Sequence, residues 1–249
     1  MKHFIFFIIM SMGFAVQAKA ECKPRPDPSQ PQYILGIGSL MSTESRKRNL
    51  PYVESAIPVL VKGHKRLFSL TAGPKDWGQK ENKNNVGWTS LGVIKGKPSD
   101  KFNAMLFKID NPKHITEDLE QREKLYCRIK IPSKQIMPYK EKKIIAGEIW
   151  AYSPMPEHTG APSEMHPIKQ SYADEFMAGC IEIEENFGIE GFAETCAKTT
   201  GWGLHWVKNR NNDPRRHEIS DSVAAKIDKV LSSAIPKVFH NRVEVKLED

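Results

Sequence analysis

Residues 33–40 read Tyr-Ile-Leu-Gly-Ile-Gly-Ser-Leu, an apolar run whose two glycines come just before a polar segment. The apolar, β-prone residues of this run predict a strand. Ser42 and Thr43 follow as helix-starting residues and Glu44 falls in the first turn, so a short helix is expected over residues 42–49. The start of the fold is therefore predicted to be a strand, a tight glycine loop and a short helix.

Beyond this start, strand patterns dominate the first part of the chain. A helix interrupts them from Asn111-Pro112 to about Lys124, because proline suits the first turn of a helix. The polar, turn-rich stretch 73–86 predicts a mobile surface loop. The predicted strands are residues 58–71 with a break near Gly63, 87–94, 102–109, 126–131 and 144–152.

Helical periodicity marks the last third of the chain. Apolar residues recur at three- and four-residue steps over residues 168–187, which predicts a long amphipathic helix with one buried face. Two further helices are predicted at about 189–198 and 221–233. The expected fold class is α+β, with a mixed, barrel-like β-sheet and flanking helices. We expect one domain over residues 33–185 and a helical C-terminal extension, 186–249, packed on it.

The first twenty residues have the pattern of an export signal. A short basic start precedes an apolar run over residues 4–16, and Ala18-Lys19-Ala20 puts small residues at the positions that a signal peptidase reads. The run is too short for a membrane anchor, and the polar, proline-rich leader 21–32 follows it at once. Cleavage after Ala20 or Ala18 fits this pattern; we take residues 1–20 as the signal peptide and predict a periplasmic or secreted mature protein.

Composition and charge exclude several classes of protein. Of the 249 residues, 39% are hydrophobic and 27% charged, which excludes collagen-like and wholly disordered chains. Without residues 1–20, which hold two lysines and no acidic residue, 35 basic residues face 30 acidic ones, a net charge of +5. The tightest basic cluster, Lys140, Lys142 and Lys143, is interrupted by Glu141 and is too sparse for a nucleic-acid-binding stripe. Neither a nucleic-acid partner nor stable membrane insertion of the mature chain is expected.

All four cysteines, Cys22, Cys127, Cys180 and Cys196, lie beyond the export signal. An even number of cysteines in an exported chain predicts one or two disulfides. Cys180 with Cys196 is the preferred pair because both fall in one predicted helical region, although four cysteines allow three full pairings. No Cys-x-x-Cys or His-x-x-x-His spacing occurs, so no metal site is predicted.

The glycine loop Gly36-Ile37-Gly38-Ser39-Leu40 is the first candidate for chemistry. It lacks the third glycine of a dinucleotide fingerprint and the Gly-Lys-Ser/Thr end of a P-loop, so phosphate binding is disfavoured. A loop of this kind can still direct several backbone N–H groups at one anion, such as a carboxylate or a developing oxyanion. A close-packed turn is the alternative, and the motif alone favours that alternative.

Glu123 is the second candidate. Among the carboxylates of residues 119–126 it lies nearest to the predicted strand, where its side chain could point into a pocket lined by the sheet. Burial raises the pKa of a glutamate, which lets the carboxyl group exchange a proton near neutral pH. A surface glutamate paired with a lysine is the alternative, and it is the commoner fate of a helical glutamate.

Four motifs follow one another along the chain: the loop Gly36-Ile37-Gly38-Ser39-Leu40, the Gly-x-x-Arg-x-Phe stretch 63–68, the Leu-x-x-x-Glu motif 119–123 and the later pair Ser171-Tyr172. In this order, over roughly residues 33–185, they resemble the gamma-glutamylcyclotransferase family. Two positions depart from the family pattern: Ile37 stands where a tyrosine is expected, and Glu120 where aspartate is more frequent. Together the four motifs are moderately specific, whereas each alone is weak.

The resemblance implies a cofactor-free reaction on a small γ-glutamyl substrate. The α-amine of the γ-glutamyl group attacks its own γ-carbonyl, releasing an amine and leaving 5-oxoproline. Ring closure is intramolecular, so holding the substrate bent supplies much of the rate and one carboxylate suffices as acid and base. By the family match Glu123 is that carboxylate, and Tyr172 contacts the glutamyl part or only packs. The substrate-binding loop is assigned by the same match to Ile37, Gly38, Ser39 and Leu40.

Other readings of the sequence have less support. No Gly-x-Ser-x-Gly elbow accompanies the loop histidines, so a serine hydrolase is disfavoured; these histidines are His158, His166, His205 and His217. Cys127 is a weak nucleophile candidate, because an exported cysteine in a strand is more often buried or bridged. A secreted binding protein that keeps the fold and the anion-holding loop remains the alternative function, since Ile37 replaces the expected tyrosine. The patch beyond the family core either packs helices, which we favour, or shapes the leaving-group side; it comprises Trp202, Trp206, Arg210, Arg215 and Arg216.

Overall fold

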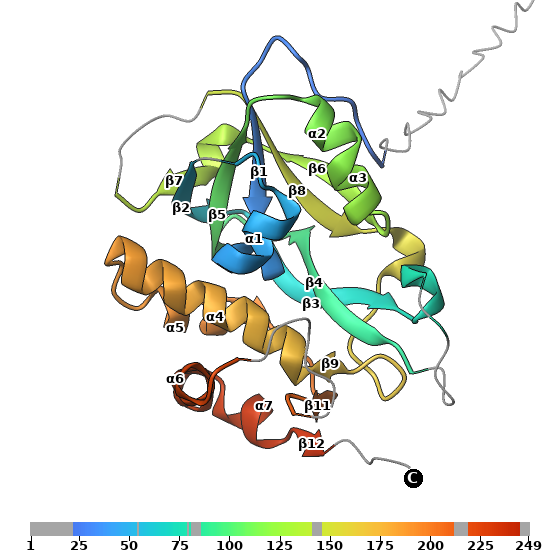
Figure 1. The fold of residues 1–249 in the computed structure, drawn as a ribbon, viewed down its shortest axis with the longest axis vertical. Coiled ribbons are helices and arrows are strands. Elements are labelled where there is room, and N and C mark those ends of the chain that lie inside the picture. The colour runs from blue at the N-terminus through green and yellow to red at the C-terminus, as the bar shows by residue number, and fades with distance from the viewer. Residues whose placement is uncertain are drawn as a thin grey trace, which may run out of the picture.

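The computed structural model describes residues 22–53, 55–78, 80, 86–140, 146–211 and 219–244. The predicted export signal lies outside these residues, as do Glu141 to Lys143 of the basic cluster and Arg215, Arg216 and His217. Within them the chain is a mixture of strands and helices arranged around one apolar core (Figure 1). The predicted α+β class is confirmed.

The larger sheet supports the start of the fold. Among the described residues it holds six strands in the order β6-β8-β1-β5-β2-β7, and β1 lies between parallel β8 and antiparallel β5. Strand β1 is central and buried, as its run of apolar residues requires. The strands are β1 (Gln32–Gly36), β2 (Ala56–Lys62), β5 (Lys101–Ile109), β6 (Tyr126–Ile131), β7 (Ile136–Pro138) and β8 (Glu148–Pro154).

A smaller sheet continues from the larger one at Gly63. This glycine has φ +73° and lies between β2 and β3, so the chain turns there, as the predicted break required. The strands do not close into a barrel: among the described residues, β3 pairs with β4 and β10 and forms one isolated bridge from Leu70 to Thr159, and the sheets stay open. The expected α+β fold class therefore fits, but the term barrel-like describes these open sheets only loosely. The smaller sheet comprises β3 (His64–Ala72), β4 (Trp88–Lys95) and β10 (Thr200–Gly201).

Two of the predicted helix boundaries need correction. The helix expected from Asn111 to Lys124 is divided into α2 (Lys113–Thr116) and α3 (Asp118–Arg122), because Glu117 leaves ideal helical geometry at φ −110° and ψ −72°. The long helix α4 (Gln170–Phe187) begins two residues later than expected, because Ile168 lies in the short strand β9 (Ile168–Lys169) instead. The predicted helix near residue 42 is confirmed as α1 (Thr43–Asn49).

The C-terminal elements pack on α4. Figure 1 shows α4 and α5 (Phe192–Lys198) beneath the sheets, with α6 (Asp221–Ala234) and α7 (Pro236–His240) on their far side. The face of α4 that carries Tyr172, Phe176, Cys180 and Ile183 is buried, as its periodicity predicted. A third small sheet joins β9 to β11 (Trp206–Lys208) and β12 (Val243–Glu244).

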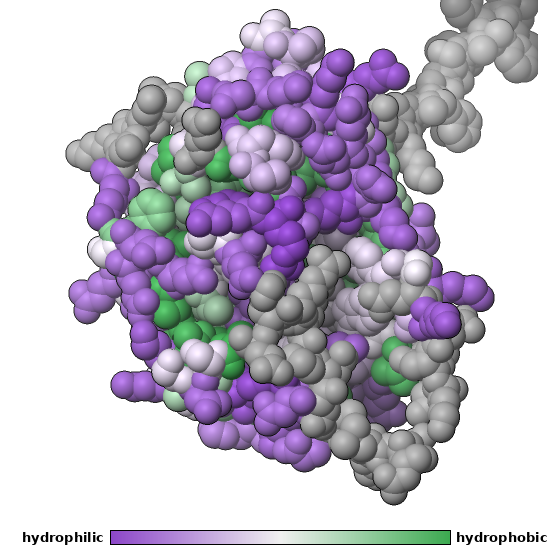
Figure 2. All heavy atoms as spheres, in the orientation of Figure 1, coloured by the Kyte–Doolittle hydropathy of each residue, from purple (hydrophilic) through white to green (hydrophobic). Residues whose placement is uncertain are grey.

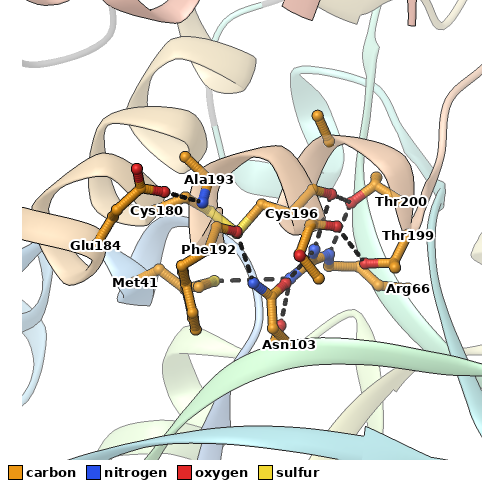
Figure 3. Close-up of a disulfide and its surroundings, with 12 residues drawn as sticks. Met41, Arg66, Asn103, Cys180, Glu184, Phe192, Ala193, Cys196, Thr199 and Thr200 are labelled. Atoms are coloured by element: carbon orange, nitrogen blue, oxygen red, sulfur yellow. Dashed lines mark hydrogen bonds between the residues drawn. A yellow bond between two sulfur atoms is a disulfide. The ribbon is translucent and has the colours of Figure 1, made fainter. Parts of the chain in front are cut away.

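Two disulfides fasten the molecule. Cys180 in α4 is bonded to Cys196 in α5, which confirms the preferred pair, and their Cα atoms lie 6.5 Å apart (Figure 3). Cys22 is bonded to Cys127 in β6. Because Cys127 is in a disulfide, it is not available as a nucleophile.

The outer surface in the view of Figure 2 is mostly hydrophilic, and its apolar patches are small and separated. No helix in the described part of the chain combines the length and the apolar composition needed to cross a membrane. The leader residues after Cys22 lie along the large sheet, where the Asp27 amide donates to Glu148 at 2.7 Å.

Replacement of Gly188 by alanine should lower the free energy of unfolding by about 1 kcal/mol. Gly188 ends α4 in the left-handed region, at φ +56° and ψ +48°, and an added Cβ meets no atom within 4 Å. The cost is therefore conformational, and the asparagine variant should lose less because asparagine tolerates this region better. Urea unfolding of both variants measures the difference; equal stabilities of wild type and Gly188→Ala would contradict it.

Candidate active site

One pocket collects all six residues that the sequence singled out. It has a volume of about 300 Å³ and lies where the end of β1, the end of α3, β4 and the start of α4 meet. The predicted residues that line it are Ile37, Gly38, Ser39, Leu40, Glu123 and Tyr172. Four segments that are distant in the sequence therefore form one cavity.

The glycine loop forms one wall of this pocket. It leaves β1 at Gly36 and turns through the one-turn 3-10 helix Ser39–Met41, in which the Met41 amide donates to the Gly38 carbonyl at 2.9 Å. In the described part of the chain, the amide N–H groups of Ser39 and Leu40 have no hydrogen-bond acceptor. Two backbone donors beside the cavity are thus left for an anionic or carbonyl oxygen of a ligand.

Glu123 is held at the junction that the sequence suggested. It follows the last residue of α3, its amide donates to the Leu119 carbonyl at 2.7 Å, and its carbonyl accepts from the Tyr126 amide at 3.0 Å. The residue is only 7% exposed, so this carboxylate is not the surface glutamate of the alternative interpretation. Its side chain forms an ion pair with Arg122, and no lysine is its partner in the described part of the chain.

Tyr172 contacts the pocket from the first turn of α4. Its hydroxyl accepts a hydrogen bond from the Leu91 amide at 3.3 Å, and the hydroxyl of Tyr126 donates to the Leu91 carbonyl at 2.9 Å. Both tyrosines therefore bind the backbone of β4 at the same residue. An ideal Cβ on Gly38 would lie 2.7 Å from the Tyr172 hydroxyl oxygen, so the loop and this ring are in close contact.

Several pocket residues were not found by sequence reasoning. Arg122 adjoins Glu123, and its position alone could have drawn attention to it. The hydroxyl of Tyr152 is buried without a hydrogen-bond partner in the described part of the chain, and burial raises its pKa to about 12. The remaining polar and aromatic lining side chains come from separate segments that no local motif connects: Ser45, Arg48, Asn49, Trp77, Trp88, Ser90, Tyr126 and Glu175.

The rival candidates lie away from the pocket. His158, His166 and His205 are not among its lining residues, and His217 falls outside the described residues. Within the described ranges, no group of three or more His, Cys, Asp or Glu side chains is arranged to hold a metal ion.

The described part of the aromatic and basic patch after residue 201 packs the C-terminal elements. Trp202 and Trp206 are stacked with ring centroids 4.8 Å apart, and Trp206 is buried. Arg210 is bound to Asp174 of α4 and Asp228 of α6, each with a shortest contact of 2.7 Å. None of these side chains lines the pocket, so the described part of the patch fixes helices together.

Gly38→Ala should destabilise the chain by about 1 to 3 kcal/mol, the usual cost of overpacking. The new methyl group would meet the Tyr172 hydroxyl, which must move away from the Leu91 amide. Adding Tyr172→Phe removes the oxygen that clashes, so the double variant should lose less stability than the sum of the single losses. Urea unfolding of the three variants tests this, and strictly additive losses would contradict the contact.

Comparisons with known proteins concern the fold. No family model and no curated protein matches this sequence. Solved structures that resemble it include one titled gamma-glutamyl cyclotransferase, with 15% identity over 80% of this chain and 99% of that one and a TM-score of 0.44. A yeast gamma-glutamyl cyclotransferase specific to glutathione has 13% identity over 82% of this chain and 97% of its own, with a TM-score of 0.40. An uncharacterised human protein has 14% identity over 80% of this chain and 98% of its own, with a TM-score of 0.40. At these identities and TM-scores the likeness reaches no further than the approximate course of the chain.

Proposed function

We propose that the chain is an exported cyclotransferase that releases 5-oxoproline and an amine or amino acid from a small γ-glutamyl substrate. One observation carries this proposal: Glu123 is buried in a pocket that is also lined by Ser39 and Leu40, whose amides have no hydrogen-bond acceptor among the described residues. A proton acceptor and a set of oxygen-binding donors are what an intramolecular acyl transfer requires.

The chemistry proceeds without a protein nucleophile. Glu123 takes a proton from the α-ammonium group, and the freed amine attacks the γ-carbonyl carbon, so that a ring carbon–nitrogen bond forms. The carbonyl oxygen gains negative charge and is bound by the amides of the Ser39–Leu40 turn. The original carbon–nitrogen bond then breaks while Glu123 returns the proton to the leaving nitrogen. The ring nitrogen still carries a second proton, which passes to the released amine, so the products are the lactam 5-oxoproline and an ammonium ion. All atoms of the substrate are recovered in 5-oxoproline and the released amine.

Ring closure explains why a small set of groups suffices. The attacking amine and the carbonyl belong to one molecule, so a pocket that holds the γ-glutamyl chain bent supplies a high effective concentration. Tyr172 would contact this chain from α4, beside the loop that it already touches at Gly38. The absence of a tyrosine at position 37 removes a ring from the wall but leaves the backbone donors in place.

Export is part of the same proposal. The signal pattern of residues 1–20 supports it, and so do two disulfides, which persist in oxidising compartments.

The small pocket, about 300 Å³, is in the range of small-molecule sites, which supports a low-molecular-weight γ-glutamyl substrate.

The test is product formation by the mature chain. Purified protein is incubated with glutathione and a panel of γ-glutamyl dipeptides and amines, and 5-oxoproline is followed by mass spectrometry. We expect 5-oxoproline together with the matching amine from at least one member. A binding protein, the alternative function, would retain a γ-glutamyl ligand unchanged: saturable binding without product from any member would favour that alternative.

A further inference from the structure

Arg122 occupies a particular place in the pocket. Its guanidinium forms an ion pair with the carboxylate of Glu123, and its Nη2 atom donates to the Ser39 hydroxyl at 3.1 Å. Its side chain is 26% exposed, whereas that of Glu123 is 9% exposed, so the arginine lies on the outer side of the pair. Arg122 therefore bridges the proton acceptor and the anion-binding loop.

The charges of the Arg122–Glu123 pair are complementary to those of an α-amino acid head group. A γ-glutamyl group carries an ammonium and a carboxylate on the same carbon atom. When the ammonium approaches Glu123, the carboxylate must lie within a short distance of it. The cation that already neighbours both Glu123 and Ser39 is Arg122. Substrate binding can thus exchange the internal Arg–Glu ion pair for two ion pairs with the ligand.

We propose that Arg122 binds the α-carboxylate of the γ-glutamyl head, and that the site consequently selects γ-glutamyl compounds whose α-carboxylate is free. The inference rests on the proposed function, because it concerns the same pocket and substrate class. The loop amides alone offer dipoles, whereas Arg122 supplies the full charge and the planar donor geometry that match a carboxylate.

Arg48 is the natural comparison within the same pocket. It lines the cavity from α1 and pairs with Glu44 at 3.9 Å along one face of that helix. Arg48 therefore comes from a different element than Arg122, which ends α3 beside Glu123. If any pocket cation sufficed, the two arginines would be equivalent; the inference distinguishes them.

The experiment compares two substrates in four proteins. One substrate is a γ-glutamyl dipeptide that the wild type converts. The other is its analogue in which the α-carboxylate of the glutamyl residue is changed to a carboxamide, with the C-terminal carboxylate kept. The kcat/KM of the wild type should be about 10- to 100-fold higher for the free acid than for the carboxamide. This is the fold-change that corresponds to the loss of a hydrogen bond to a charged group. Arg122→Gln should lose most of this preference, mainly through KM for the free acid, and Arg122→Lys should restore part of it. Arg48→Gln should keep the wild-type preference.

A preference ratio separates binding of the carboxylate from a merely structural effect. If Arg122 only positions Glu123, Arg122→Gln slows both substrates equally and the ratio stays at the wild-type value, which overturns the inference. Loss of the ratio in Arg48→Gln instead would assign the α-carboxylate to Arg48. Thermal unfolding of each variant identifies any that fail to fold, and Arg122→Lys then serves as the test.

Failure of the inference and failure of the proposed function give different results. Conversion of both substrates at equal efficiency by wild type refutes the carboxylate site and leaves the cyclotransferase. Absence of conversion, with calorimetric binding of the free acid that weakens in Arg122→Gln, refutes the cyclotransferase and leaves the carboxylate site. Neither conversion nor binding of either compound contradicts both.

Discussion

Glu123→Gln should lower kcat for 5-oxoproline release by about 100- to 10,000-fold, the range expected for a general acid and base. Glutamine keeps the size of the side chain and one acceptor oxygen, but its NH2 group replaces the other oxygen and it accepts no proton at the relevant step. The backbone contacts that hold the residue, to Leu119 and Tyr126, do not depend on the carboxylate. The variant should therefore fold and still bind the substrate.

The control for this substitution is Glu120→Gln. Glu120 lies in the same helix α3 but pairs with Arg128 at 3.0 Å, and it does not line the pocket. Steady-state kinetics of the two variants, with calorimetric binding to Glu123→Gln, separates chemistry from folding. A wild-type rate in Glu123→Gln, or an equal loss in Glu120→Gln, would contradict the assignment of Glu123.

Arg210→Met should lower the free energy of unfolding by about 3 to 5 kcal/mol, because it leaves a buried carboxylate uncompensated. Asp174 is 1% exposed and accepts two hydrogen bonds from Arg210, at 2.7 and 2.9 Å. Without the guanidinium its described partner is the Gln170 side-chain amide, at 2.6 Å. The same substitution also releases α6, since Arg210 binds Asp228 there.

The control here is Asp228→Asn. Its side chain is 39% exposed, so losing its charge should cost under about 1 kcal/mol. Adding Asp174→Leu to Arg210→Met should recover part of the loss, since the buried charge is then removed as well. Urea unfolding of these variants tests the account, and equal losses in Arg210→Met and Asp228→Asn would contradict it.

The pH dependence of this contact follows from its charges. The hydrogen bonds that Arg210 donates to Asp174 and, with a smaller effect, to Asp228 raise the pKa of Arg210 above its usual value despite burial. A cation whose pKa is raised on folding contributes stability that is complete below its unfolded pKa. The contribution of Arg210 is therefore present at neutral pH and is lost only under strongly alkaline conditions.

Local patterns were sufficient for the elements with strong periodicity. The buried face of α4 followed from apolar residues at three- and four-residue steps, and this placed Cys180 opposite Cys196. The turn after β1 followed from its glycines and from Ser42, whose hydroxyl caps α1 at the Ser45 amide. Each of these features depends on neighbours within a few residues.

Elements that depend on pairing with distant segments could not be predicted from the sequence. Strands β7, β9, β10, β11 and β12 have two or three residues, too few to show an alternating pattern. The same limit applies to the pocket: Trp77, Trp88, Tyr152 and Glu175 meet there from segments that are far apart. Glu123 could be singled out because a motif contains it, whereas its low exposure, 7%, follows from the folded structure and not from that motif.

The most direct test of the central claim follows the substrate's own nitrogen and oxygen atoms. A γ-glutamyl dipeptide with heavy nitrogen in its α-amine is converted by the mature chain in water enriched in heavy oxygen, and the products are analysed by mass spectrometry. Cyclisation predicts 5-oxoproline that carries the heavy nitrogen and no oxygen from water, because the amine displaces the leaving group directly. Glutamate that contains heavy oxygen from water would instead show hydrolysis and would contradict the account.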